Sequence, residues 1–432
     1  MDHTYIRDIG KHVGEEISLK GWLYNKRSSG AIRFLLLRDG TGIVQCVVRQ
    51  QDVEEATLEV CDLLGQESSM IIRGTVSADE RSPGGFEVAV LDGGIETIQV
   101  TEDYPITPKE HGTAFLMDNR HLWIRSRKQW AILRVRARVI KAIRDWLDSN
   151  GFLHVDTPIF TPAAVEGTTT LFPVDYFGES VYLTQSGQLY NEANIMSFGK
   201  VYCFGPTFRA EKSKTRRHLT EFWMVEPEMA FYDLEDNMVV IEQMVEAVVK
   251  DVLADCTEEL EILERDITML QKVEAPFPRI HYDEAVSRLQ KSGFEFEWGG
   301  DFGSPEETEL ARQFDKPFFV THYPAAIKAF YMSRDPERPE CALACDLLGP
   351  EGYGELVGGS QREDNLDELK KRIAEHDLPL ESFEWYLDLR KFGTVPHSGF
   401  GLGVERTVTW ICGIEHLRET IAYPRMLHRI NP

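Results

Sequence analysis

Cysteine is scarce and shows none of the spacings that mark a disulfide framework or a zinc site. The chain has seven cysteines in 432 residues, no two form a CxxC pair, and an odd number cannot all be paired in disulfides. No apolar run reaches the roughly 18 residues of a membrane-spanning helix, and the first residues, MDHTYIRDIGKH, hold no apolar signal-peptide segment. We therefore expect a reducing, cytoplasmic setting and no membrane association.

Positive charge is also scarce overall. Acidic residues number 71 against 47 Lys and Arg, for a formal net charge of -24. This balance excludes a uniformly basic nucleic-acid binder but leaves room for basic segments. The phosphate-binding pattern GxxxxGK[ST] is lacking, as is a complete GxGxxG within a strand–helix–strand unit. With 42% hydrophobic and 27% charged residues, the chain should fold around a sizeable core, in about two or three domains.

The first 100 residues contain five short runs rich in β-branched and aromatic residues, separated by turn residues such as Asp39-Gly40. Between the third and fourth runs, residues 52–64 place apolar side chains on one helical face. Five strands with a helix at this position predict an OB-fold, a small barrel that often binds oligonucleotides. The five runs are 17–23, 33–37, 43–48, 70–76 and 86–91.

The positive charge of this barrel lies on its first three strands. Residues 1–50 hold 8 Lys and Arg against 5 acidic residues, whereas residues 51–100 hold 2 against 11. A solvated sheet face explains this distribution, and so does a surface where Arg27 meets phosphates and Phe34 stacks on a base. The composition leaves both interpretations open.

A stiff linker follows the barrel, because TEDYPITPKEHG at 101–112 contains two prolines. We assign residues 1–101 to the barrel, 102–118 to a hinge and 119–432 to a larger domain. Helices and strands do not alternate regularly in the larger domain, so we expect an α+β fold with an antiparallel sheet flanked by helices. The expected helices are 128–147 and 235–253, and the expected strands are 181–184, 201–208, 222–231 and 318–321.

Three segments of the larger domain carry side chains suited to chemistry. The first segment, at 151–162, is GFLHVDTPIFTP and predicts a short strand containing Pro158. This strand is either a sheet edge where two subunits pair or an ordinary strand and turn. TFRAEKSKTRRHLTEF at 207–222 sets five cations within ten residues, as in an anion-binding loop or a solvated basic loop. The third segment, at 397–412, is HSGFGLGVERTVTWIC, and its three glycines lead into an expected helix that carries Arg406. Glycines and a helix start can favour an anion, but this pattern alone is weak evidence of an anion site.

In this order, the three segments resemble the three motifs of class II aminoacyl-tRNA synthetases. Pro158 belongs to the first motif, FRAE and RHLTEF to the second, and GLGVER to the third. The N-terminal barrel is typical of the aspartate/asparagine/lysine subgroup. The resemblance runs essentially end to end and is strongest to asparaginyl-tRNA synthetases, in AVEGTTTLF (164–172), YLTQSGQLYNEA (182–193), EFWMVEPEMAF (221–231) and PEGYGELVGGSQR (350–362).

The resemblance implies a site for bent ATP with Mg²⁺. Arg209 would hold the α-phosphate, Glu211 the adenine side and Arg406 the γ-phosphate side, and these three are the implied catalytic residues. Glu355 would bind Mg²⁺, which prefers carboxylate and phosphate oxygens. Asp346 is either a second carboxylate of this site or a helix or turn cap. The implied ATP-binding residues are Arg209, Glu211, Arg217, His218, Leu219, Glu355, Gly403 and Arg406.

The resemblance also implies L-asparagine as the amino acid. Aspartate enzymes carry a lysine in QSPQLYK, whereas this chain has Asn191 in QSGQLYN, and an uncharged amide needs no cation opposite it. Glu226 stands where those enzymes have Asp, and a carboxylate accepts hydrogen bonds from an amide while repelling a carboxylate substrate. The implied amino-acid-binding residues are Glu166 and Gln188 at the amino end, then Asn191, Arg209, Glu226 and Arg362.

For the barrel, the resemblance implies binding of the anticodon of tRNA(Asn). Phe34 would stack on the central uridine, Gln45 would read its edge, and Arg27 would contact the backbone or a neighbouring base. Residues 119–144, with nine Lys and Arg and no acidic residue, either face tRNA or pair with an acidic surface, including that of a partner subunit.

The expected function is therefore that of a homodimeric asparagine–tRNA ligase. Such an enzyme forms asparaginyl-adenylate from ATP and transfers the amino acid to the terminal adenosine of tRNA(Asn). Three alternatives remain at this point: an aspartate enzyme of relaxed specificity, an adenylating ligase similar to asparagine synthetases, and a paralogue that only binds RNA.

Overall fold

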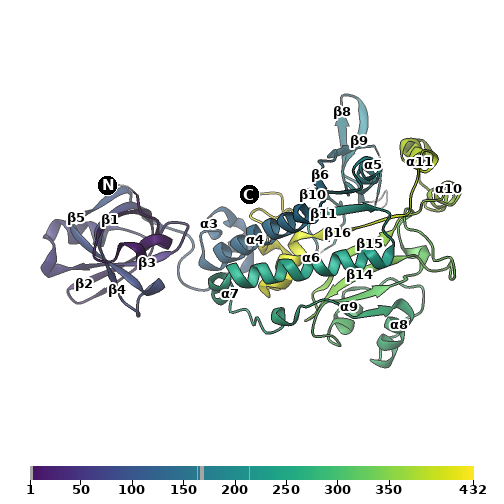
Figure 1. The fold of residues 1–432 in the computed structure, drawn as a ribbon. Coiled ribbons are helices and arrows are strands. Elements are labelled where there is room, and N and C mark those ends of the chain that lie inside the picture. The colour runs from purple at the N-terminus through teal and green to yellow at the C-terminus, as the bar shows by residue number, and fades with distance from the viewer. Residues whose placement is uncertain (1–2, 163, 166–169, 214) are drawn as a thin grey trace. The chain divides into compact units, whose positions relative to one another are not determined.

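The computed structural model describes residues 3–162, 164–165, 170–213 and 215–432. The chain divides into two compact units, Met1–Met117 and Asp118–Pro432. Figure 1 labels many of their helices and strands. Within the segment expected as a hinge, a short helix, α2 (Thr113–Asp118), begins.

The first unit is a closed barrel of five strands with the order β1-β2-β3-β5-β4. Side chains at alternating positions, such as Leu35 and Leu37, fill its core, as the period of two in a strand requires. Helix α1 (Glu55–Leu63) lies between β3 and β4, so the OB-fold prediction is confirmed. The strands are β1 (Glu16–Ser29), β2 (Ile32–Arg38), β3 (Ile43–Arg49), β4 (Ser69–Ala78) and β5 (Phe86–Gln99).

Strand β1 continues to Ser29, beyond the end that the sequence pattern predicted at residue 23. Its polar second half pairs with β2 through main-chain groups, from Asn25 opposite Leu36 to Ser29 opposite Ile32. The hydrophobic pattern misses this half because ladder hydrogen bonds need no apolar side chains.

The second unit is built on an eight-stranded sheet with the order β12-β13-β14-β15-β16-β11-β10-β6. The pairs β10–β6 and β12–β13, at its two edges, are parallel and the remaining pairs are antiparallel. The α+β prediction is confirmed, with a mixed rather than a strictly antiparallel sheet. The strands are β6 (Leu153–His154), β10 (Lys200–Phe208), β11 (Glu221–Ala230), β12 (Arg279–His281), β13 (Phe318–Thr321), β14 (Ala344–Gly349), β15 (Gly354–Gln361) and β16 (His397–Gly403).

Two long helices, α4 (Arg127–Ser149) and α6 (Leu234–Asp255), pack against each other beside this sheet (Figure 1). Their apolar stripes, which include Val139 and Val248, are buried in one core with residues of the sheet. Each helix begins where a side chain caps it: Ser126 accepts a hydrogen bond from the Gln129 amide, and Asp233 forms a capping box with Asp236. Both helices lie where the sequence periodicity predicted them.

The basic run at 119–144 pairs within the chain. On α4, Arg138 contacts Asp251 and, at 2.8 Å, Asp255 of α6, and Arg136 Nη2 lies 2.8 Å from Glu405 Oε1. Of the two interpretations left open by the sequence, pairing with acidic side chains therefore holds for these residues.

A three-stranded sheet, in the order β7-β9-β8, accompanies the main sheet. Pro158 lies between β6 and β7 and not inside a strand, so the expected strand containing it is wrong. Proline has no amide to donate to a ladder, and the strands on either side are only two residues long. The small sheet consists of β7 (Phe160–Thr161), β8 (Pro173–Tyr176) and β9 (Glu179–Leu183).

Shorter helices complete the second unit, and among them the sequence analysis expected only α12, from the three glycines that lead into it. All seven cysteines are free and buried. Within the described parts of the chain, no helix is both long enough and apolar enough to cross a membrane. The shorter helices are α3 (Arg120–Trp123), α5 (Gln188–Phe198), α7 (Thr257–Ile262), α8 (Tyr282–Lys291), α9 (Ser304–Ala311), α10 (Leu366–Glu375), α11 (Glu384–Lys391) and α12 (Val404–Cys412).

Candidate active site

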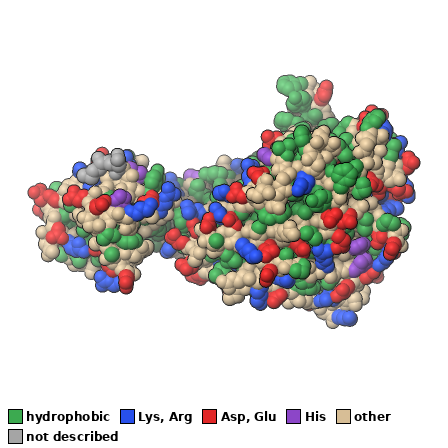
Figure 2. Space-filling model, viewed as in Figure 1, with side chains coloured by type: hydrophobic (Ala, Val, Ile, Leu, Met, Phe, Trp, Pro, Cys, Tyr) green, Lys and Arg blue, Asp and Glu red, His purple; other side chains and the backbone are tan. Residues whose placement is uncertain are grey.

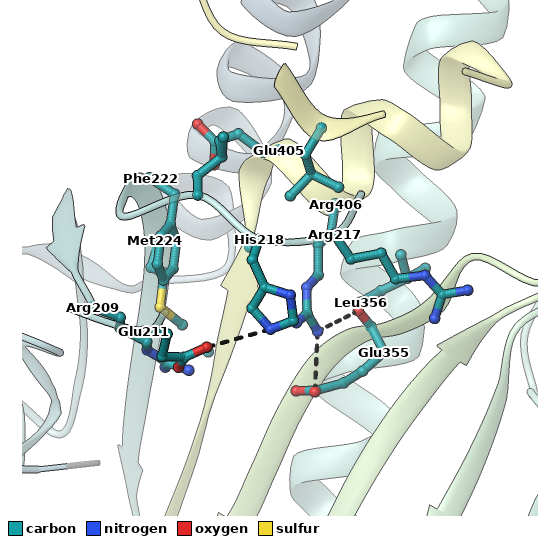
Figure 3. Close-up of a pocket in the computed structure, with 14 residues that line it drawn as sticks. Arg209, Glu211, Arg217, His218, Phe222, Met224, Glu355, Leu356, Glu405 and Arg406 are labelled. Carbon is teal, nitrogen blue, oxygen red and sulfur yellow. Dashed lines mark hydrogen bonds and ion pairs between the residues drawn. The ribbon is translucent and has the colours of Figure 1, made fainter. Parts of the chain in front are cut away.

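A pocket with an empty volume of about 630 Å³ lies in the second unit (Figure 3). Its walls come from the connection between β10 and β11, from β15, and from the end of β16 with the start of α12. All eight residues that the resemblance implied for ATP line this pocket. The fold thus brings together three segments that are distant in sequence.

Arg209 and Glu211 follow directly on β10, whose long antiparallel pairing with β11 fixes their position. The guanidinium carbon of Arg209 lies 5.5 Å from the ring centre of Phe222. Its Nε is buried and has no hydrogen-bond partner among the residues that the structure describes. A buried guanidinium N–H without a partner fits an anionic ligand, because an unpaired buried donor is costly and Arg presents planar donors to phosphate.

His218 lies beside Glu211, with 3.3 Å between Nε2 and Oε2 (Figure 3). Burial lowers the pKa of His218, and the charges of Arg406 and Arg209 lower it further against the pull of Glu211. The imidazole is therefore neutral at pH 7, and this part of the pocket keeps its cationic charge on the arginines.

Arg406, at the start of α12, holds Glu355 of β15. Its Nη1 donates to Glu355 Oε2 at 3.1 Å and to the main-chain oxygen of the same residue at 3.0 Å (Figure 3). Burial opposes ionisation of Glu355, but the charges of Arg406, Lys328 and Arg209 outweigh it and lower the pKa of the carboxyl group. Glu355 is therefore a carboxylate anion.

A second carboxylate, Asp346 of β14, converges with Glu355 over Gly358. A Cβ atom at Gly358 would lie 2.9 Å from Glu355 Oε1 and 3.6 Å from Asp346 Oδ1. Lys328 donates to Asp346 at 2.7 Å, yet burial raises the pKa of Asp346 to about 6, and Glu355 adds to the rise. Asp346 lies within a strand, so the alternative that it caps a helix or turn is wrong.

The convergence of Glu355 and Asp346 fits a Mg²⁺ ion. Mg²⁺ is usually held by one or two carboxylates together with phosphate oxygens of the substrate. Among the described residues, no group of three or more His, Cys, Asp or Glu side chains is placed to hold a metal. The donor set therefore suits a cation that arrives with a phosphate ligand.

Arg217 is held at the edge of the pocket by helix α9. Its Nη1 lies 2.9 Å from Glu307 Oε2 and its Nη2 donates to Thr308 Oγ1 at 3.1 Å and to the Gly352 carbonyl. Burial raises the pKa of Glu307 to about 7, and Glu355 adds to the rise. The sequence reasoning missed Glu307, because no local pattern links residues 90 positions apart.

Asn191 and Glu226, the two residues implied for selection of the amino acid, are joined to each other. Asn191 Nδ2 donates to the main-chain oxygen of Glu226 at 3.0 Å. The Glu226 carboxylate accepts hydrogen bonds from the Ser186 hydroxyl and, at 2.9 Å, from the Gly187 amide, just before α5. The N-terminus of a helix stabilises such a negative charge. Asn191 is thus a link between α5 and β11.

Arg362, implied for the substrate side chain, is buried in a two-pronged ion pair with Glu228. Its Nη1 donates to Ser360 Oγ at 2.8 Å. Glu228 was missed by the sequence reasoning, although the spacing of Glu226 and Glu228 on one strand signals side chains on the same face.

Gln188, implied for the amino end of the substrate, is buried at the start of α5 and donates to Glu192 Oε1 at 3.1 Å. The sequence reasoning missed Glu192 as well, although residues four apart on a helix lie on one face. Glu166, implied for the same end, lies outside the described residues.

In the barrel, Arg27, Phe34 and Gln45 form one surface. The guanidinium carbon of Arg27 lies 4.3 Å from the ring centre of Phe34, and Arg27 Nη2 is 3.5 Å from Gln45 Oε1. Gln45 Nε2 donates to Ser82 Oγ at 3.1 Å. A planar cation over an aromatic ring is the arrangement that a stacked base would extend or replace.

Comparison with known proteins gives matches over both units. The family of class II tRNA synthetases (D, K and N) matches residues 113–427, and the OB-fold nucleic acid binding domain matches residues 17–97. An asparagine–tRNA ligase of Desulforamulus reducens is 57% identical over 432 residues, with 100% of both chains covered. One of Pelotomaculum thermopropionicum is 55% identical over the same length, again covering 100% of each.

A solved structure is similar over the same extent. The crystal structure of asparaginyl-tRNA synthetase from Pyrococcus horikoshii, complexed with asparaginyl-adenylate, matches with a TM-score of 0.97 and 48% identity. The match covers 100% of this chain and 100% of that one.

Proposed function

The chain belongs to the class II tRNA synthetases (D, K and N), and from this membership we propose how its reaction proceeds. Its activity is that of an asparagine–tRNA ligase. The observation that carries this assignment is the match, over the whole length of both chains, to a synthetase that holds asparaginyl-adenylate. The pocket with Arg209 and Arg406 is where ATP binds.

In the first step the carboxylate of L-asparagine attacks the α-phosphorus of ATP in line with the leaving pyrophosphate. The mechanism requires no nucleophilic side chain, because positioning and charge neutralisation lower the barrier. Arg209 holds the α-phosphate with its unpaired Nε, whereas Arg217 and Arg406 face the outer phosphates. Glu211 and His218 bound the adenine side.

Mg²⁺ accompanies ATP in this proposal. Glu355 would hold it, with Asp346 as the second carboxylate, and the ion would neutralise charge on the phosphate oxygens. The pairing of Arg406 with Glu355 places a cation on the other side of the same carboxylate.

Selection of asparagine over aspartate rests on Glu226. Its carboxylate accepts hydrogen bonds from an amide NH₂ group and repels a second carboxylate. Arg362 binds the side-chain oxygen, and Gln188 and Glu166 bind the α-ammonium group. Asn191 contributes by being uncharged and by fixing the strand that carries Glu226.

In the second step the 3′-hydroxyl of the terminal adenosine of tRNA(Asn) attacks the acyl carbon of the adenylate. An ester forms, the bond to AMP breaks, AMP leaves and the hydroxyl gives up its proton. The barrel binds the anticodon: Phe34 stacks on a base, Gln45 reads a base edge, and Arg27 contacts the backbone or a neighbouring base. The free, buried cysteines support a reducing cytoplasmic location.

Two copies of the chain form a homodimer in this proposal. An aromatic cluster on the small β7-β9-β8 sheet supports it, because the rings of Phe160, Tyr176 and Phe177 contact one another in series and Phe177 is 94% exposed. Figure 2 shows hydrophobic side chains gathered where the β8–β9 hairpin protrudes. Light scattering of the intact chain tests this proposal, and a mass of 49.4 kDa at micromolar concentration would contradict it.

Pyrophosphate exchange with asparagine and aspartate, run side by side, tests the amino acid. We expect exchange with asparagine to be faster, and faster exchange with aspartate would refute the proposed selection. Exchange that continues while tRNA(Asn) remains uncharged would instead favour an adenylating ligase that acts without tRNA.

A further inference from the structure

A buried carboxylate lies behind Gln188 and collects hydrogen bonds from four side chains. Glu192 is inaccessible to solvent and follows Gln188 by one turn of α5. Its oxygens accept from the Tyr386 hydroxyl, 2.8 Å from each, from Arg390 Nη2 at 2.7 Å and from Gln188 Nε2 at 3.1 Å. His397 Nε2 lies 2.9 Å from Oε2.

These partners come from α5, α11 and β16, and the helix α11 lies beside α5 (Figure 1). Arg390 is itself fixed, because its Nε donates to the Glu363 carbonyl at 2.8 Å. Glu192 is therefore held from three directions and cannot turn toward a different partner without breaking several buried hydrogen bonds at once.

Glu192 is ionised in this setting. Burial favours the neutral acid, but the charge of Arg390 and the hydrogen bond from His397 outweigh it and hold the pKa of Glu192 far below its usual value. An ionised carboxylate can only accept hydrogen bonds. The amide of Gln188 can therefore meet it only through its NH₂ group, and its oxygen must face away from Glu192.

We infer that Glu192 is a positioning residue for the amino acid: it fixes the Gln188 side chain so that the amide oxygen faces the α-ammonium group of the substrate. This inference rests on the proposed role of Gln188 at the amino end. An ammonium group has three donors and needs acceptors, so an amide that presents its NH₂ group would repel it. Glu192 decides which end of the amide the substrate meets.

A purely structural role would be different. Glu192 would then only join α11 to α5, and its loss would weaken the protein without distinguishing one substrate from the other. The two roles differ in their effect on the Michaelis constants of asparagine and ATP, and in whether the effect passes through Gln188.

The test is Glu192→Gln, in which the new amide can donate as well as accept. We expect the KM for asparagine in pyrophosphate exchange to rise about 10- to 100-fold, the range of one hydrogen bond to a charged group. The KM for ATP should change less than about 3-fold, since Glu192 is not among the residues that line the ATP pocket. Equal increases in both constants would overturn the inference.

A double-mutant cycle tests the path through Gln188. After Gln188→Ala, the further change Glu192→Gln should alter the KM for asparagine less than about 2-fold, because the oriented amide is already gone. If the two substitutions instead raise the KM for asparagine by factors that multiply, they act independently, and the positioning role is refuted. Glu242→Gln is the matched control, because Glu242 is another buried carboxylate, on α6, and accepts a hydrogen bond from the Phe277 amide at 3.0 Å.

If Glu192→Gln does not fold by itself, a variant that exchanges the side chains of residues 188 and 192 still tests the inference. Gln188→Glu alone places two carboxylates together and should abolish asparagine binding. Combined with Glu192→Gln, it restores one donor and one acceptor, and should recover a KM within about 10-fold of the parent. Failure to recover in a folded double variant would contradict the inference. If the parent prefers aspartate, the proposed specificity fails, but the same cycle run with aspartate still decides the role of Glu192.

Discussion

The side-chain amide of Asn191 donates a hydrogen bond to the main-chain carbonyl of Glu226, with 3.0 Å between Nδ2 and O. Asn191 is fully buried, and Asn194 donates to its oxygen at 3.2 Å. The position that the resemblance implies for substrate contact therefore serves first to join α5 to β11. It fixes the backbone from which the Glu226 carboxylate projects.

Asn191→Asp should weaken both the fold and the binding of asparagine. The substitution removes the hydrogen bond from Asn191 and sets an acceptor against the carbonyl of Glu226, which costs about 1–3 kcal/mol. Urea unfolding measures the loss of stability, and pyrophosphate exchange measures the KM. Asn194→Ala is the control, since Asn194 donates to the Asn191 oxygen and leaves the hydrogen bond from Asn191 to Glu226 in place. A parental KM in Asn191→Asp would contradict the link.

Gly187→Ala should be strongly destabilising for its size. A Cβ atom there would clash with Thr157 Oγ1 and lie 2.6 Å from Cys203 Sγ, which is itself 3.5 Å from Glu226 Oε2. Overpacking of a buried site costs about 1–3 kcal/mol. Gly205→Ala, with nothing within 4 Å of the added atom, should change the unfolding free energy much less. Equal unfolding free energies of the two variants would contradict this prediction, because they would show that the neighbours of Gly187 move to admit the added methyl group.

Arg209→Ala should lower the rate of asparagine-dependent pyrophosphate exchange about 100-fold or more, because it removes the donors that we propose for the α-phosphate in the transition state. Its affinity for tRNA should stay nearly unchanged. Arg216→Ala is the control, since Arg216 lies on the same connection but pairs with Glu415, 2.7 Å away, and does not line the pocket. Normal exchange by Arg209→Ala would refute the role of Arg209.

Phe34→Ala should reduce affinity for tRNA(Asn) by about 1–3 kcal/mol, the contribution of one stacked base. Pyrophosphate exchange without tRNA should be unaffected. Trp22→Ala tests specificity, because Trp22 is another partly exposed aromatic of the barrel with an arginine, Arg38, 5.0 Å from its ring centre. Filter binding measures the affinity of both variants for tRNA(Asn). Equal losses of affinity would argue against an anticodon surface at Phe34.

Stability should fall as the pH is lowered from 7 to 5, partly through His416. Burial, reinforced by Arg418, lowers the pKa of His416 to about 4, whereas an unfolded histidine titrates near about 6.5. Between these values only the unfolded chain takes up the proton, so the contribution is complete above pH 6.5 and is lost toward pH 4. His416→Asn keeps an acceptor for the Arg418 amide. Between pH 7 and pH 5, the Tm of this variant should fall about 2 °C less than the Tm of the parent.

Elements whose signals are local could be predicted from the sequence. The five barrel strands, α4 and α6 follow from alternating or helical periodicity with caps, and the order of the three motifs leads to the family. The eight residues that the resemblance implies for ATP could be named in advance, because each lies in or beside one of the short motifs, and all eight line one pocket.

The partners of those residues could not be predicted. Glu307 against Arg217, and Arg390 and His397 against Glu192, join positions about 90 to 200 residues apart. Hydrophobic periodicity predicts which face of a segment is buried in the core. These ion pairs and hydrogen bonds depend instead on which distant segments the fold places next to one another.

By itself, the sequence determined the two domains, the barrel and the set of charged residues that line the pocket, because local composition, spacing and short motifs carry these features. Only the tertiary structure decided that Asn191 turns to the backbone of Glu226, that Arg27 covers Phe34, and that Glu192 holds Gln188. A side chain's direction depends on the donors and acceptors that the fold places within about 3 Å of it.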